Sequence, residues 1–485
     1  MMTVPLGDML LKILPELGLL VLAAVLLTLD LLWRSRRCRY LGWIAAGGGA
    51  VVILLSLLFA RPGPEPLLLW GGMMRLDSTG FVFRMLFVTG MAITALFATE
   101  NEGICEHGEF FTLLVISTLG MTLMASAVDL IMIYLAFETA SIPLYALAGF
   151  LIRDKKSVES GVKYLLFGAM TSAVMLYGFS LLYGFTGSTN LYEIGMQMSA
   201  GQLPAGLGVL TALLVAVGFA FKVSAAPLHF WAPDVYEGAP TSVAGFLSTA
   251  SKAAGFAVLL RIMLVVYPAL SSLWTALIAA LAVASMVVGN LQALNQKNIK
   301  RLLAYSSIAQ AGTILIGAAA QSDFGVTATM YYLMAYLVTN LAAFGVVMVV
   351  GRAVGSDEIS AYAGLSRRSP GMALILLAVL LSLGGIPPFA GFIGKLLVFG
   401  AAVEANMAWL AVVGVINSIA ALYYYLRVLK VVYLDRAENE TQPLNLTPAW
   451  KAALVGCAVL VVVLGVLVSP FYTWASQAAA SLIVY

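Results

Sequence analysis

The sequence predicts an all-α polytopic membrane protein, and its composition and the length of its apolar runs carry that prediction. The chain has 485 residues, of which 62% are hydrophobic and 10% charged, whereas a soluble globular domain is about 45–50% apolar and about 25% charged. The apolar residues form long unbroken runs, not the alternating ten-residue segments of an outer-membrane barrel. The composition therefore excludes a water-soluble enzyme, a disordered protein and a nucleic-acid binder.

A membrane-spanning helix needs about 20 mostly apolar residues, and we count fourteen such segments in the sequence. The first segment lacks the cationic n-region and cleavage site of a removable signal peptide, so we keep it as a helix. The predicted spans are 10–32, 41–60, 78–98, 109–127, 130–151, 160–186, 206–226, 241–265, 269–292, 302–320, 325–351, 371–400, 407–429 and 450–475.

The distribution of basic residues predicts the topology, because lysine and arginine gather in cytoplasmic loops. With each loop numbered by the helix it follows, even loops hold only Arg61, Arg75 and Arg261. One missed helix would reverse the parity of every later loop, so the bias favours fourteen spans with both termini on the outer face. Asn439 and Asn445 begin N-x-T triplets in a loop on the cytoplasmic side, and we interpret them as chance matches. The odd loops hold sixteen basic residues: Arg34, Arg36, Arg37, Arg39, Arg153, Lys155, Lys156, Lys297, Lys300, Arg301, Arg352, Arg367, Arg368, Lys430, Arg436 and Lys451.

Few residues are available for cofactor chemistry. The chain has two histidines and three cysteines, Cys38, Cys105 and Cys457, without a CxxC motif. That leaves almost nothing for a metal, haem or iron–sulfur site. No G-x-x-x-x-G-K-[ST] loop is present, so ATP is not the expected energy source. We expect this chain to bind no cofactor.

Four charged residues lie deep inside apolar stretches: Glu138, Lys222, Lys252 and Lys395. A charge at the bilayer centre costs about 3 kcal/mol on insertion scales. One glutamate cannot neutralise three lysines, and burial disfavours the charged form of a lysine. A buried lysine that gives up and regains its proton can serve in a relay, and Glu138 placed near Lys222 would hold the proton on that lysine. The alternative is that the charges pair only to hold helices together.

Four other basic residues lie within a turn or two of a span end: Lys12, Arg84, Lys163 and Arg427. Long basic side chains at such positions can extend to the lipid headgroups. We interpret the four in this way, while Lys163 also remains a candidate for proton transfer.

The helices of Lys222 and Lys395 are interrupted, at 225–227 and at 384–388. Proline removes a backbone donor, and backbone groups freed at mid-membrane are tolerated only in a protein interior or at a watery cavity. The breaks are 160 residues and five helices apart, so the two helices cross the membrane in opposite directions, as in an inverted repeat. His229 follows the first break and is either a hydrogen-bonded structural residue or a proton-transfer group.

The predicted fold thus has two inverted five-helix repeats, helices 4–8 and 9–13, with helices 7 and 12 broken. The division along the chain is 1–108 for helices 1–3, 109–268 for the first repeat, 269–430 for the second, and 431–485 for a cytoplasmic loop and helix 14.

Five stretches resemble the antiporter-like membrane subunits of respiratory complex I, the NADH–quinone oxidoreductase. The similarity runs over nearly the whole chain, and its helix-6 stretch and tyrosine cluster favour the subunit N group. The chain also lacks the long lateral helix that follows the last span of the larger related subunit, which favours subunit N or the other mid-sized paralogue. The stretches are 157–187, 221–259, 298–308, 384–395 and 423–427.

The resemblance implies a fourteen-helix subunit with a proton half-channel in each repeat. It implies that Glu138 pairs with Lys222, that Lys252 is central, and that Lys395 faces the outer exit. It also implies proton transfer by Lys163 and His229.

One position departs from the family pattern. Gln310 stands where the family often has a histidine, and because glutamine does not titrate, a relay step through that position is in doubt. The family also implies NADH, flavin, iron–sulfur clusters and quinone elsewhere in the complex, other membrane-arm subunits as partners, and a bacterial inner membrane.

Three alternatives to a proton-translocating complex I subunit remain at this point. One is a subunit of a multisubunit sodium/proton antiporter, and a second is a subunit of a membrane-bound hydrogenase. The third is a structural membrane scaffold. A sodium site favours several oxygen ligands, ideally carboxylates, and only Glu138 is expected to be both deep and acidic, so we favour protons.

Overall fold

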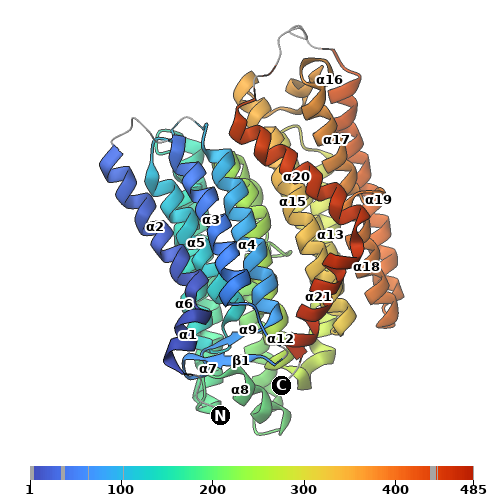
Figure 1. Ribbon diagram of the computed structural model, residues 1–485. Coiled ribbons are helices and arrows are strands. Elements are labelled where there is room, and N and C mark those ends of the chain that lie inside the picture. The colour runs from blue at the N-terminus through green and yellow to red at the C-terminus, as the bar shows by residue number, and fades with distance from the viewer. Residues whose placement is uncertain are drawn as a thin grey trace.

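The computed structural model describes residues 5–33, 39–63, 65–101, 103–436, 444 and 446–483, and it is built almost wholly of helices (Figure 1). The N-terminal half contains α1 (Leu6–Lys12), α2 (Leu14–Trp33), α3 (Arg39–Phe59), α4 (Ser78–Ala98), α5 (Gly108–Ser126), α6 (Leu130–Ala148), α7 (Lys155–Thr186), α8 (Leu191–Ser199), α9 (Ala205–Lys222), α10 (Trp231–Gly238), α11 (Thr241–Phe246) and α12 (Lys252–Val265).

The C-terminal half contains α13 (Ser271–Leu294), α14 (Ile299–Ala319), α15 (Asp323–Val354), α16 (Leu365–Arg368), α17 (Pro370–Gly384), α18 (Ala390–Glu404), α19 (Ala408–Tyr433), α20 (Pro448–Val466) and α21 (Val468–Ile483). Short helical turns are η1 (Trp70–Gly72), η2 (Leu247–Ser251), η3 (Pro268–Leu270) and η4 (Ile359–Tyr362).

The prediction of an all-α polytopic membrane protein is confirmed. Within the described ranges, thirteen helices are long and apolar enough to cross a membrane. The predicted span 371–400 is not among them, because the structure divides it into α17 and α18, each shorter than a full crossing. The predicted span 450–475 is also divided, at Leu467, and of its two parts in the described chain α20 is the one long and apolar enough to cross a membrane. The count of fourteen crossings stays a prediction.

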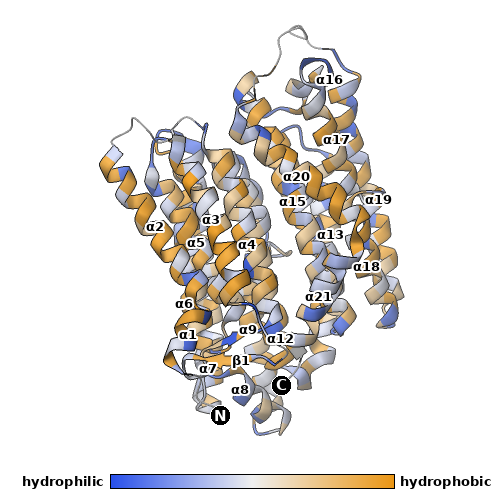
Figure 2. Ribbon diagram, in the orientation of Figure 1, coloured by the Kyte–Doolittle hydropathy of each residue, from blue (hydrophilic) through white to orange (hydrophobic). Residues whose placement is uncertain are grey.

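The interior and exterior of this bundle are both apolar, as expected for a protein in lipid. Figure 2 shows hydrophobic residues along the lengths of the helices and hydrophilic residues gathered towards their ends. Large apolar side chains are exposed on α2, α3, α7 and α19. The helices most completely buried are the segment Thr241–Val265, α14 and α15. These central helices are the ones that carry or contact the deep polar residues.

Several helices begin at side chains that suit an N-cap, since a short polar side chain satisfies backbone N–H groups that have no partner inside the helix. Asp77 caps α4, Asp129 caps α6 and Asp154 caps α7, each by accepting from backbone N–H groups of the first turn. Asn298 and Ser322 do the same for α14 and α15. Local sequence therefore sets where these long helices start.

Both predicted breaks are present. The first separates α9 from α10 and has Ser224 at φ 58° and a cis Ala226–Pro227 peptide bond. The second separates α17 from α18 and has Gly385 at φ 85° and a cis Pro387–Pro388 bond. Gly385 is required there for space as well as for its backbone angle, because a Cβ atom would lie 2.8 Å from Cδ of Lys395.

Two local features were not predicted. A small antiparallel hairpin, β1 (Leu67–Leu69) and β2 (Met74–Leu76), occupies the loop after α3, with Leu67 opposite Leu76. The turn η2 is π-helical and lies directly before Lys252. Such turns are rare and frequent at functional sites.

The two ends of the chain meet near this hairpin. In Figure 1 the red helices α20 and α21 run obliquely across the bundle, and α21 packs against α15 and α4. Thr79 donates a hydrogen bond of 2.7 Å to the Ala478 carbonyl. The C-terminal helix thereby ties the start of α4 to the second half of the protein.

The position of Arg261 corrects the count of basic residues in the outer loops. The charge count assigns Arg261 to an outer loop although the predicted span 241–265 contains it, and it lies inside α12 with no exposed surface. It is buried there because Asp77 supplies a carboxylate at 2.9 Å, so it does not report on loop topology. The loop residues Arg34, Arg36 and Arg37, and the triplet residues Asn439 and Asn445, lie outside the described residues.

Candidate functional site

Lys222 ends α9 at the edge of the first break, and only 1% of its surface is exposed. Its Nζ donates to Oγ of Ser141 at 2.7 Å and lies 4.9 Å from the ring centroid of Phe137. Both residues are on α6 and flank Glu138. Helix neighbours three positions apart share a face, so Glu138 lies beside the serine that holds the lysine.

The expected Glu138–Lys222 ion pair is not formed in the described part of the chain. The lysine uses a neutral hydroxyl instead, and Oε1 of Glu138 is buried without a hydrogen-bond partner. A buried acceptor without a donor is costly. Glu138 is therefore available to accept a proton or a bridging water.

Lys252 is the first residue of α12 and is 1% exposed. Its Nζ donates to both the carbonyl oxygen and Oγ of Ser307 on α14, each at 2.9 Å. One turn further along α12, a Cβ atom at Gly255 would lie 3.1 Å from Cγ of Lys222. The helix that carries Lys252 thus packs directly on the stem of Lys222.

Lys395 lies on α18 and contacts the end of α17 across the second break. Its Nζ donates to the carbonyls of Leu383 and Gly384, at 2.9 and 3.2 Å. The last carbonyls of a helix have no partner within the helix and carry partial negative charge. The second break therefore creates the acceptor site for Lys395, whereas Lys222 at the first break donates to Ser141 of α6.

Gln310, which stands where the family often has a histidine, takes part in a series of hydrogen bonds, and this series is called the connection below. Its Nε2 donates to the Leu383 carbonyl at 2.9 Å, the oxygen that also accepts from Lys395, and to Oη of Tyr425 at 3.3 Å. Its Oε1 accepts from the hydroxyl of Tyr332 at 2.5 Å. The amide thus links the second break to two buried tyrosines.

The same connection continues to the serine pair on α14. The hydroxyls of Tyr425 and Ser306 are 2.5 Å apart, and Ser306 is the chain neighbour of Ser307, which accepts from Lys252. Polar groups therefore extend from Lys395 almost to Lys252. The tyrosine cluster served in the sequence only to mark a resemblance, and no local pattern signalled that one of its hydroxyls faces Gln310.

His229 lies within the first break and is 6% exposed. Its Nδ1 is buried without a hydrogen-bond partner in the part of the chain that the structure describes. One nitrogen of this imidazole is therefore free to take part in proton transfer.

Lys163 belongs to a charged cluster at one end of the bundle. Its Nζ lies 2.6 Å from Oδ2 of Asp234 and 2.7 Å from Oε1 of Glu159. Arg301 Nη1 lies 2.9 Å from Asp234 Oδ1 and also 2.9 Å from Glu237 Oε2. The groups surround a pocket of 190 Å³. Lys163 does not merely extend to the headgroups but pairs with carboxylates.

The cluster joins three helices through the two carboxylates of α10. Asp234 bridges Lys163 of α7 and Arg301 of α14, while Glu237 bridges Lys156 and Arg301. Burial alone would raise the pKa of Asp234, but its hydrogen bonds from Lys163 and Arg301 outweigh that effect and lower the pKa below its ordinary value. Both carboxylates are therefore held ionised, and α10, which directly follows the first break, is tied to both halves of the protein.

Two further arginines are buried against carboxylates that sequence reasoning missed. Arg84 was expected to reach the headgroups, but it is 2% exposed and its Nη2 lies 2.7 Å from Oε1 of Glu16. Arg261 pairs with Asp77 at 2.9 Å and donates to the Ala125 carbonyl at 2.8 Å. Both acids lie near the ends of membrane spans, where the sequence does not indicate whether a carboxylate is buried.

Arg427 and Lys12 are the other two residues that were expected near span ends. Arg427 donates to the carbonyls of Leu294 and Gln296, at 2.7 and 2.6 Å, at the end of α13. Lys12 is the last residue of the short helix α1. Among the described residues, no group of three or more His, Cys, Asp or Glu side chains is placed to hold a metal ion.

The comparisons with known proteins identify the family of this chain. The family described as NADH:quinone oxidoreductase/Mrp antiporter, transmembrane, matches residues 127–421. The NADH-quinone oxidoreductase subunit N of Moorella thermoacetica is 44% identical over 460 residues, covering 94% of this chain and 95% of the relative. The subunit N of Heliobacterium modesticaldum is 46% identical over 410 residues, covering 84% and 86%.

Solved structures give the same result. A chain of respiratory complex I from Thermus thermophilus with bound aureothin matches with a TM-score of 0.80 and 34% identity, covering 95% of this chain and 98% of that one. A chain of the Mrp complex from Dietzia has a TM-score of 0.86 at 21% identity, covering 99% and 98%, and shows the shared fold. This chain belongs to the subunit N family of NADH-quinone oxidoreductases, the antiporter-like subunits of the membrane arm.

Proposed function

We propose that the chain moves protons across the membrane as a non-redox subunit of an NADH:quinone oxidoreductase, driven by electron transfer elsewhere in the complex. One observation carries the proposal: three buried lysines each donate to a neutral oxygen, and none is paired with a carboxylate in the described residues. A buried charge that only holds helices together needs an opposite charge. A lysine bound to a hydroxyl or carbonyl can lose its proton without leaving a buried carboxylate behind.

The proposed relay uses the groups in the order of their contacts. Glu138 and Lys222 exchange a proton beside Ser141, with Lys163 and His229 serving transfer in the same half. Lys252 stands between the two halves, and Lys395 is the terminal group towards the outer face. Serine and tyrosine hydroxyls can both accept and donate, so the Ser306–Tyr425 contact suits transfer between Lys252 and Lys395. Gln310 orients these groups but does not itself titrate.

The wider assignment follows the subunit N relatives. The partners are the other membrane-arm subunits, and NADH, flavin, iron–sulfur clusters and quinone act in other chains of the complex. We place the protein in a bacterial plasma membrane with both termini on the outer face. The two breaks support two inverted repeats, 109–268 and 269–430, with one broken helix in each.

Lys222→Ala and Glu138→Gln test the relay. The complex is purified through a tag on this chain, and assembly, NADH:quinone reductase activity and proton uptake into vesicles are measured. We expect assembled complexes with weak proton translocation, with Lys451→Ala, an exposed lysine, as the matched control. Lost assembly of both variants would support a scaffold instead, and normal pumping by Lys222→Ala would refute the role of Lys222.

The sodium/proton antiporter remains the competing function, and the same vesicles test it. Glu138 is the one carboxylate beside the deep lysines in the described chain, which provides too few oxygen ligands for a sodium site. Proton uptake should therefore be unchanged when choline replaces sodium. A tagged chain that purifies alone, lacks NADH activity and shows sodium-dependent proton flux would favour the antiporter.

A further inference from the structure

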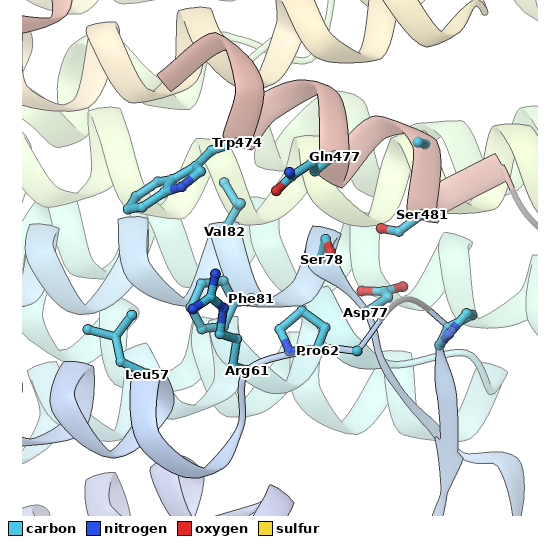
Figure 3. Close-up of a pocket in the computed structure, with 13 residues that line it drawn as sticks. Leu57, Arg61, Pro62, Asp77, Ser78, Phe81, Val82, Trp474, Gln477 and Ser481 are labelled. Carbon is cyan, nitrogen blue, oxygen red and sulfur yellow. The ribbon is translucent and has the colours of Figure 1, made fainter. Parts of the chain in front are cut away.

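A pocket of 530 Å³ lies between the loop after α3, the start of α4 and the C-terminal helix α21. Figure 3 shows Trp474 and Gln477 on one side, Leu57 and Arg61 on the other, and Phe81 and Val82 between them. The guanidinium group of Arg61 projects into the space between these walls (Figure 3). The pocket thus combines an apolar lining with one cation directed inward.

The three basic residues assigned to even loops meet at this pocket. Arg61 lines it, and Arg75 and Arg261 lie behind Asp77, which also lines it. Basic residues are disfavoured on the outer side of membrane proteins, and the other sixteen loop cations of this chain are assigned to the opposite side. Arg261 is buried in α12 and pairs with Asp77, so Arg61 is the cation that lines the pocket itself.

Asp77 does not supply enough negative charge. Its Oδ1 accepts from the Gly80 N–H at 2.7 Å, and its Oδ2 lies 2.9 Å from Arg261 and 3.6 Å from Arg75. One carboxylate thus faces two guanidinium groups. Arg61 adds a third cation, for which the described residues provide no carboxylate partner. In the described residues, Arg61 is therefore the cation of this pocket that is available to an anionic ligand.

The pocket opens at the edge of the surface that faces lipid. Leu57 is 43% exposed and Trp474 is 46% exposed. Tryptophan is enriched at membrane–water interfaces, where its ring lies at headgroup level. A ligand here would have an anionic group next to Arg61 and apolar chains that continue along α3 into the bilayer.

We propose that this pocket binds the phosphate of an anionic phospholipid. Arg61 provides the counter-charge, Gln477 donates a hydrogen bond, and Leu57, Phe81 and Trp474 contact the glycerol and the upper acyl chains. The volume lies within the range of about 300–1,000 Å³ that is typical of small-molecule sites. The lipid would join α3, α4 and α21, the elements that bring the two ends of the chain together.

The test uses the whole complex, purified in mild detergent and placed in phosphatidylcholine bilayers that contain a photoactivatable phosphatidylglycerol. Cross-linking followed by peptide mapping should label segments 57–63, 78–82 and 474–481, whereas a photoactivatable phosphatidylcholine should label them several-fold less. Arg61→Gln should lose this selective labelling and one retained anionic lipid per complex by native mass spectrometry. Arg153→Gln, an exposed arginine at the opposite end, should keep both.

Two results would overturn the proposal. Equal labelling by the two lipids in the wild-type complex would show that the pocket does not select an anion, and this measurement does not depend on a variant folding. Arg61-dependent retention of radiolabelled inorganic phosphate without selective lipid labelling would assign the pocket to a free anion. Arg61→Lys, which keeps the charge, should retain most of the lipid.

Discussion

The buried cations of this protein fall into two groups that differ in their partners. Arg84 and Arg261, on α4 and α12, each face a carboxylate at 2.7 or 2.9 Å. Among the described residues, the buried lysines donate only to hydroxyl and carbonyl oxygens. Arginine stays charged at all ordinary pH values, whereas a buried lysine readily becomes neutral. The arginines therefore hold helices together, and the residues suited to exchange protons are Lys222, Lys252 and Lys395.

The largest effect is expected from breaking an arginine pair. Arg261→Ala leaves the carboxylate of Asp77 buried without its main partner, and such a loss destabilises a protein by about 3–5 kcal/mol. We expect little assembled complex on a native gel. Asp77→Asn combined with Arg261→Leu removes both charges of the pair and keeps an oxygen that can cap α4, so it should restore part of the assembly, although Arg75 also loses a carboxylate at 3.6 Å. Equal loss in the single and the double variant would show that the pair itself is not what matters.

Lys252→Met should separate transport from stability. Methionine has a similar shape, and near-isosteric replacements in a core cost less than about 1.5 kcal/mol. In the part of the chain that the structure describes, no carboxylate loses its partner, because Lys252 donates there only to Ser307. The complex should therefore assemble and oxidise NADH while proton uptake per electron falls severalfold. The matched variant Arg84→Met should instead lose assembly, and failure of both variants to assemble would remove the distinction between the groups.

The charged cluster at Asp234 gives a pH-dependent test of intermediate size. The substitution Arg301→Gln removes the hydrogen bonds from Arg301 that lower the pKa of Asp234 and of Glu237. Their pKa values then rise, so both carboxylates become protonated at a higher pH than in the wild type. The ion pairs, which are intact above the carboxylate pKa and lost as pH falls through it, should fail earlier on acidification.

The measurement is proton uptake as a function of pH. The acidic limb should move to higher pH by about one unit, the lower end of the effect of a neighbouring arginine on a carboxylate. Arg301→Lys keeps a cation and should shift the limb less. An unchanged profile in Arg301→Gln would show that the cluster does not take part in uptake.

The difference between the two groups of cations also explains what the sequence could predict. The lysines and the breaks were found because each is a local violation of an apolar run. Their partners are distant in the chain: Arg84 and Glu16 are 68 positions apart, and Gln310 and Tyr425 are 115 apart. In lipid, the exposed face of a helix is as apolar as its buried face. Periodicity therefore does not show which helices face each other, and neither Glu16 nor Asp77 could be assigned.

The smallest effect is expected from a single hydroxyl, and it compares two adjacent tyrosines. Tyr425 joins Ser306 to Gln310, whereas Tyr424 packs against Tyr425 and donates to Oδ1 of Asn290 at 3.1 Å. Replacing either by phenylalanine removes a buried hydrogen bond, with a cost of about 0.5–1.5 kcal/mol. The two variants should therefore have similar thermal stability.

Proton uptake should distinguish them. Tyr425→Phe interrupts the contacts between the serine pair and the second break, so uptake per electron should fall by about half or more if hydroxyl groups carry protons between Lys252 and Lys395. Tyr424→Phe leaves the Ser306–Tyr425 and Tyr425–Gln310 contacts in place and should reduce uptake much less. Because the two changes remove the same atom from neighbouring positions of one helix, equal pumping by both variants would mean that protons reach Lys395 by another route and that the lysines, not the hydroxyls between them, determine the path.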